Sequence, residues 1–191
     1  MKIIVTVLLF VTCWNTTYAQ DAALAKDERG KYIYYEVVEA KGVARATLVQ
    51  RASDFLKTVN KKLVSFENAS DTAVAGKGTF MIVLNKSVLA HPSGAVHYRF
   101  TAELRDEKYR FWLTDFGFIP FARDRYGNFV PATTFSTPLE KSPGKLGASE
   151  WKKYLESTAT QAKSFGDQFK AYLQKAETRK TEPAAVNKTR W

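Results

Sequence analysis

Few side chains of this sequence could carry out chemistry. It holds two histidines, His91 and His97, and one cysteine, Cys13. It lacks CxxC, HExxH, GxSxG, a Walker phosphate loop and an intact GxGxxG. Asp115 and Asp124 could supply general-acid catalysis, but no partner is identifiable for either, and Asp115 is expected to cap the end of a strand. We therefore expect no metal, no cofactor and no enzymatic activity. A hydrolase that uses Asp115 and Asp124 is an alternative.

The stretch Ala95–Phe116 has the pattern of a β-hairpin around which the other elements are organised. Its apolar residues alternate with polar ones on both sides of a charged turn at Asp106-Glu107, the period of strands with one buried face. A two- or four-residue turn pairs Leu104 with Tyr109, Ala102 with Phe111 and Phe100 with Leu113, and it sets Glu103 opposite Arg110. A three-residue turn would slip this register by one residue. The predicted sheet has one apolar face, which needs a cover.

Basic side chains are the second candidate for function. The formal net charge is +10, with lysine and arginine scattered over the whole chain, whereas a nucleic-acid-binding protein concentrates them on one face. The outer face of the hairpin would carry His97, Arg99, Arg105, Lys108, Arg110 and Trp112. A solvated sheet face accounts for these residues better than base stacking does, so we do not expect a nucleic-acid partner. Anionic lipid head groups or acidic glycans suit the charge better.

The remaining elements place this hairpin in a mixed α and β domain. The expected order is a strand at 32–39 with Ile33, Tyr35 and Val37 on one face, a helix at 44–60, and strands at 62–67 and 76–84 joined by a polar loop at 68–75. Gly76 and Gly78 stand where the last of these strands begins. They indicate a bulge or a close approach of two backbones.

The C-terminal third has two parts. Residues 120–148 form an aromatic loop rich in proline and glycine, which we expect to lie on the domain or to frame a groove. Ser149 is expected to cap a long helix over 149–177, where Trp151, Leu155, Thr158, Ala162, Phe165, Phe169, Tyr172 and Ala176 repeat at heptad spacing. Aromatic residues suit packing on a sheet better than a coiled coil, so we expect this helix to cover the hairpin within a monomer. A helix that serves a partner is the alternative.

The first residues indicate export. Lys2 precedes an apolar run that is too short to span a bilayer, and Thr17-Tyr18-Ala19 fits a signal-peptidase site. We expect a signal peptide at 1–19, a leader at 20–30, a core domain at 31–119 and a disordered tail at 178–191. A lipid anchor on Cys13 is the weaker alternative. The mature chain would then be periplasmic or secreted, without cysteine and without a transmembrane segment.

Three segments resemble a bacterial family of exported domains that is common in Bacteroidota. They are Tyr35–Glu39, Ala75–Gly78 (Ala-Gly-Lys-Gly) and Tyr98–Asp115, and the likeness covers about 32–118. The family is a domain of unknown function with a TATA-binding-protein-like (TBP-like) fold. The resemblance implies an α+β domain, a curved antiparallel sheet of about five strands with helices on its convex side, in the order β-α-β-β-β-β-α. It supplies no catalytic residues, and the fold name does not imply DNA binding.

Together these observations predict a non-enzymatic exported domain that binds a protein or another envelope component. The partner would contact the sheet face or the aromatic loop, at Arg99, Arg110, Trp112, Tyr126 and Phe129. A surface module that binds anionic lipid or glycan is a second possibility. The hydrolase is a third.

Overall fold

The computed structural model describes residues 23–59, 64–84, 90–141 and 144–175. Along the chain the elements are β1 (Ala25–Lys26), β2 (Tyr32–Glu39), α1 (Arg45–Asp54), the π-helical turn η1 (Phe55–Val59), β3 (Val64–Ala69), β4 (Ala73–Ile82), β5 (Gly94–Arg105), β6 (Lys108–Arg123), β7 (Phe129–Pro131), β8 (Thr137–Pro138) and α2 (Gly144–Gln174). The predicted signal peptide and C-terminal tail lie outside the described residues.

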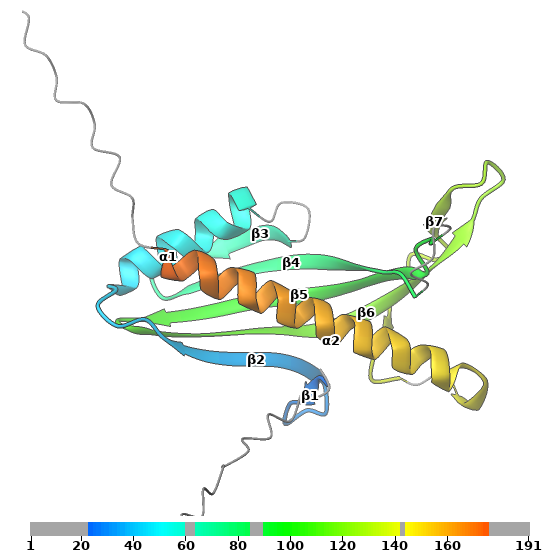
Figure 1. The fold of residues 1–191 in the computed structure, drawn as a ribbon, viewed down its shortest axis with the longest axis horizontal. Coiled ribbons are helices and arrows are strands. Elements are labelled where there is room, and N and C mark those ends of the chain that lie inside the picture. Colours follow the sequence, from blue (N-terminus) through cyan, green and yellow to red (C-terminus); the bar gives the residue numbers. More distant parts are fainter. Residues whose placement is uncertain (1–22, 60–63, 85–89, 142–143, 176–191) are drawn as a thin grey trace, which may run out of the picture.

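The strands form one antiparallel sheet in the order β1-β2-β6-β5-β4-β3, with β7 and β8 paired to β6. Both α1 and α2 lie on the same face of this sheet, and α2 crosses it diagonally (Figure 1). The predicted α+β class is therefore confirmed: an open antiparallel sheet with its helices on one face. Strands β2 to β6 are the five predicted strands, and β1, β7 and β8 are short additions.

The central hairpin has the predicted register. The two-residue turn Asp106-Glu107 joins β5 to β6, and it pairs Leu104 with Tyr109, Phe100 with Leu113 and Glu103 with Arg110, as well as Ala102 with Phe111. All the apolar members of these pairs are buried beneath the helices. The alternation of side chains was sufficient to predict this register because a slip by one residue would bury charged side chains.

Strand β6 does not end near Asp115, as the sequence suggested, but continues to Arg123. The pairing of β5 and β6 shifts between His97 and Arg99, so that β6 gains one residue there, and Asp115 takes a φ of 55°. This β-bulge reverses the alternation of β6. Phe116 and Phe118 therefore join the buried face, and Asp115 lies within the strand and does not cap its end.

Helix α2 provides most of the cover for the sheet. Its buried residues are Trp151, Tyr154, Thr158, Ala159, Ala162, Phe165, Gly166, Phe169 and Leu173, with Leu155 and Tyr172 half-buried beside them. The Phe169 ring centroid lies 5.0 Å from that of Phe111 and 5.2 Å from that of Phe100. The expected packing of this helix on the sheet is confirmed, but the helix begins at Gly144, and Ser149 lies inside it rather than at its cap.

A polar cluster fastens α2 to strand β2. The Lys170 ammonium lies 2.7 Å from the Glu36 carboxylate and 3.0 Å from that of Asp167, and the Tyr34 hydroxyl donates to Glu36. Burial, with the bond to Glu36, raises the pKa of Tyr34 well above its ordinary value. Tyr34 and Glu36 point toward α2. Tyr35 and Val37, which were predicted to share one face of this strand, therefore lie on the side of the sheet away from the helices.

The first helix and the first hairpin differ in detail from expectation. The apolar face of the helix is buried as predicted, at Leu48, Ala52, Phe55 and Leu56, but its last turn is the π-helical η1. Strand β4 begins at Ala73, so the loop after β3 is shorter than predicted, and Gly76 lies inside the strand. There a Cβ atom would lie 2.6 Å from the Ser65 carbonyl oxygen, and β3 is bulged opposite. The predicted close approach of two backbones is confirmed.

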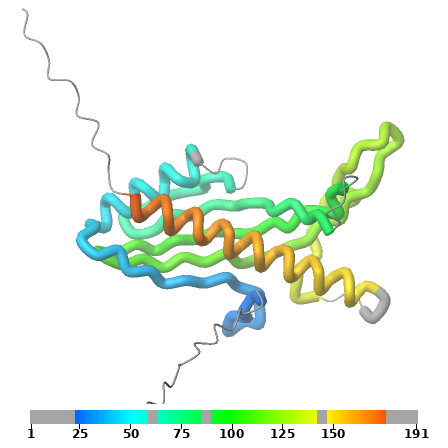
Figure 2. The backbone as a smooth tube through the Cα atoms, in the orientation of Figure 1, coloured from blue at the N-terminus to red at the C-terminus, as the bar shows by residue number. Residues whose placement is uncertain are grey.

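The segment 120–148 is not a loop that lies on the domain. It holds the end of β6, strands β7 and β8 and the first turn of α2, and the β6–β7 hairpin extends away from the rest of the domain (Figure 2). Tyr126, in the turn of this hairpin, is 73% exposed, and Phe135 is 82% exposed. The expectation that these aromatic residues would be covered was wrong for both.

Substitutions on opposite faces of β6 should differ sharply in cost. Phe111→Ala should lower the free energy of unfolding by about 3–5 kcal/mol, because it leaves a cavity beneath α2. Arg110→Ala should leave it nearly unchanged, because exposed ion pairs contribute little. Urea unfolding followed by circular dichroism measures both. Similar losses for the two variants would contradict the observed orientation of the strand.

Candidate functional site

The sheet face opposite the two helices, here called the open face, carries an exposed apolar pair beside arginines. Tyr35 and Val37 on β2 are each 47% exposed. The register sets Tyr35 beside Trp112 and Val37 beside Arg110. On the other side of β6, Glu103 and Arg105 of β5 continue the same face. The open face is thus a mixed surface of aromatic, aliphatic and basic side chains.

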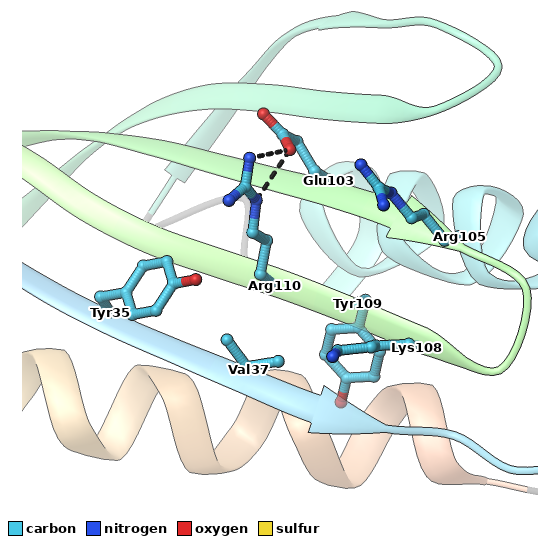
Figure 3. A pocket seen from close by; sticks show the side chains of 7 residues that line it. All are labelled: Tyr35, Val37, Glu103, Arg105, Lys108, Tyr109 and Arg110. Atoms are coloured by element: carbon cyan, nitrogen blue, oxygen red, sulfur yellow. Dashed lines mark hydrogen bonds and ion pairs between the residues drawn. The ribbon is translucent and has the colours of Figure 1, made fainter.

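A hollow of about 210 Å³ lies in this face near the β5–β6 turn (Figure 3). We call it the Arg110 hollow; it is lined by Tyr35, Val37, Glu103, Arg105, Lys108, Tyr109 and Arg110. The Arg110 guanidinium donates to Glu103 from Nε at 2.8 Å and from Nη2 at 2.6 Å. Bonds to Glu103 and to the Tyr35 hydroxyl raise the pKa of Arg110. The guanidinium also lies 5.7 Å from the Trp112 ring centroid, so Arg110 is held in place on three sides.

A second hollow of about 300 Å³ lies further along the same face. It is lined by Ser65, Lys77, Gly78, Thr79, His97, Tyr98, Arg99 and Asp115. Lys77 pairs with Glu67 at 2.6 Å, and Asp115 pairs with Lys31. The carboxylate of Asp115 is therefore occupied by a lysine from the segment before β2.

The two candidate catalytic aspartates are not part of one site. Asp124 lies in the β6–β7 turn, where the backbone N–H groups of Tyr126 and Asn128 each donate to it at 2.8 Å. These bonds, the one from Asn128 foremost, hold its pKa below the ordinary value. A general acid needs a raised pKa to be protonated near neutral pH. Asp124 is instead the ionised acceptor of a tight turn, while Asp115 lies in the bulge of β6.

The histidines are also separated. His91 stacks on the Phe129 ring at a centroid distance of 4.4 Å, next to the projecting β6–β7 hairpin. His97 lies on the open face, where its Nδ1 is 2.8 Å from the Thr79 hydroxyl. Within the described ranges, no group of three or more His, Cys, Asp or Glu residues could hold a metal ion. In the same ranges, no helix is long and apolar enough to cross a membrane.

The residues proposed from sequence as a partner-binding site fall into two groups. Arg99, Arg110 and Trp112 share the open face, whereas Tyr126 and Phe129 belong to the projecting hairpin. Sequence reasoning did not assign a role to Tyr35 and Val37. Both alternating sets of β2 contain aromatic and aliphatic residues, so the strand alone does not reveal which set α2 covers.

The open antiparallel sheet with two helices on one face makes this chain an α+β protein, and the comparisons below show that its fold is TBP-like. Residues 34–118 match the family described as "Domain of unknown function (DUF4468) with TBP-like fold". This part of the chain is therefore similar to the DUF4468 family, as its sequence segments suggested.

Two crystal structures share the fold. One is a TBP-like protein from Parabacteroides distasonis ATCC 8503, with 14% identity and a TM-score of 0.62 over 82% of this chain and 99% of that one. The other is a DUF4468 family protein from Bacteroides ovatus ATCC 8483, with 17% identity and a TM-score of 0.59 over 83% and 94%. Among curated proteins, none matches this sequence. Since the shared structure covers more of the chain than 34–118, the fold extends beyond the family match.

The backbone at Asp115 gives a test of the bulge that shapes the open face. Asp115→Gly and Asp115→Val both remove the partner of Lys31, but only valine is strained at a φ of 55°. The valine variant should be less stable than the glycine variant by about 1–2 kcal/mol. Urea unfolding of the two variants measures the difference. Equal stabilities would mean that residue 115 does not have a left-handed conformation.

Proposed function

We propose that this chain is an exported, non-enzymatic domain of the bacterial envelope that binds a protein partner through its open face. The observation that carries the proposal is the exposed pair Tyr35 and Val37 beside Arg110 and Trp112, on the face opposite both helices. Tyrosine, tryptophan and arginine are the residues most enriched at the energetic centres of protein interfaces. A site where Arg110 is already held in place needs little further ordering on binding.

The dimensions of the face fit this role. Five strands spaced about 4.8 Å apart are roughly 24 Å wide, and the 12 residues of β5 are roughly 40 Å long. Their product is about 960 Å², comparable to the ~800 Å² that each partner contributes to a standard protein interface. The separation of Asp115 from Asp124, together with the lowered pKa of Asp124, argues against the hydrolase alternative.

Capture of the partner tests the proposal. Three purified proteins are immobilised and exposed to envelope extract: the wild-type mature chain, the Tyr35→Ser variant and the Tyr126→Ser variant. The proteins that each one retains are compared by mass spectrometry. We expect Tyr35→Ser to lose a protein that the wild type and Tyr126→Ser both retain. The control replaces a more exposed tyrosine, on the projecting hairpin. Loss with Tyr126→Ser alone, or with neither variant, would contradict binding through the open face.

Export is tested separately. The apolar run and the Thr17-Tyr18-Ala19 site predict that the mature protein begins at Gln20. N-terminal sequencing of protein purified from fractionated cells should read Gln20 in the periplasmic or secreted fraction. An intact Met1, or a lipid on Cys13, would refute this expectation.

A further inference from the structure

The Arg110 hollow contains two cations besides Arg110 itself. Arg105 and Lys108 are directly opposite each other in the register, where they close the turn between β5 and β6. Both are exposed. Like charges directly opposite on antiparallel strands repel each other and destabilise the pair. Within the described ranges, neither side chain forms an ion pair.

The acidic side chains around this pair form their hydrogen bonds and ion pairs with other groups. Glu103 accepts both bonds from Arg110. In the turn, Asp106 accepts from the backbone N–H of Arg45, and Glu107 accepts from that of Gly42. Glu39 lies opposite Lys108 in β2, but its carboxylate is 3.9 Å from Lys41.

We propose that the Arg110 hollow binds a carboxylate side chain from an acidic segment of a protein partner. This inference rests on the function proposed above and names the chemistry of the partner. Arg105 and Lys108 supply the unpaired positive charge, and Tyr35 and Val37 supply an apolar wall next to it. The carboxylate would lie between the two cations and relieve their repulsion.

The size of the hollow favours a single side chain. Its volume is about 210 Å³. That is enough for one carboxylate side chain, but it is below the ~300 Å³ at which pockets begin to enclose a small-molecule ligand. Tyr35 and Val37 are alternate residues of a strand, so they are spaced at the side-chain repeat of an extended peptide. An extended acidic segment could therefore place a carboxylate in the hollow and an apolar side chain against β2.

A pair of charge-matched variants tests the proposal. The probe is poly-L-glutamate, titrated into the mature chain at about 0.15 M salt, where the Debye length is about 8 Å, and followed by calorimetry. The double variant with Arg105→Glu and Lys108→Glu should weaken binding by at least about tenfold, since it reverses the sign of both charges that face the carboxylate. The control, Lys153→Glu with Lys175→Glu, makes the same change in net charge on exposed lysines of the helical layer. It should weaken binding by less than about threefold, as expected for remote screened charges.

The other outcomes are equally informative. Equal weakening by the two double variants would mean that net charge alone attracts the probe, and the inference would be wrong. Binding to phosphatidylglycerol vesicles without binding to poly-L-glutamate would also overturn it, in favour of a lipid surface. Circular dichroism checks the fold of each variant. If the first variant does not fold, Arg105→Gln with Lys108→Gln replaces it, and Lys153→Gln with Lys175→Gln becomes its charge-matched control. If these tests fail while Tyr35→Ser still abolishes capture, the open face remains the binding surface and only the carboxylate assignment is lost.

Discussion

The packing of α2 on one side of the sheet is the interaction on which the rest of this structure depends. Phe169 contacts Phe100, Phe111 and Phe55, with ring centroids 5.0–5.3 Å apart. Aromatic side chains bury more area than other residues and interlock at defined angles, so this cluster provides much of the core. The cluster also decides which alternate residues of each strand face water. The side chains on the opposite face lie outside this core.

Much of this arrangement could be predicted from the sequence because the central hairpin is strictly alternating. A one-residue slip would have buried Arg110, so the register was determined by the cost of burying charge. The heptad spacing of aromatic residues likewise predicted that α2 covers the sheet. Tyr154 and Leu173 were missed because the stripe follows a straight helix on a twisted sheet and drifts from strict heptad positions.

Three features could not be derived from local pattern. The bulge at Asp115 depends on a left-handed residue that is not glycine, and it reverses the alternation without a sequence signal. The start of α2 at Gly144 was not expected, because glycine has a low helix propensity. The orientation of β2 was ambiguous because both of its faces are partly apolar, and the contact of Glu36 with Lys170 from a distant helix decides it. Because Glu36 faces the helix, the alternate residues Tyr35 and Val37 face away from it and belong to the candidate site. The sequence did not reveal this, because the contact joins residues far apart in the chain.

The candidate site is recognisable because it departs from the internal consistency of the rest of the chain. Elsewhere on the open face, Lys77 pairs with Glu67, Arg110 with Glu103 and Lys31 with Asp115. Arg99, which has no ion pair within the described residues, stands opposite Lys77 and Thr114. Arg105 and Lys108 are placed opposite each other without such a match. Most charged residues of this surface follow the rule that opposite charges pair, and this pair breaks it at a concave, partly apolar surface. Such a local departure is typical of a functional site, because selection for function can retain an arrangement that stability alone would not favour. An anionic group from outside the chain would supply the missing match, which is why this hollow, and not the more exposed aromatic residues of the projecting hairpin, is the better candidate for recognition.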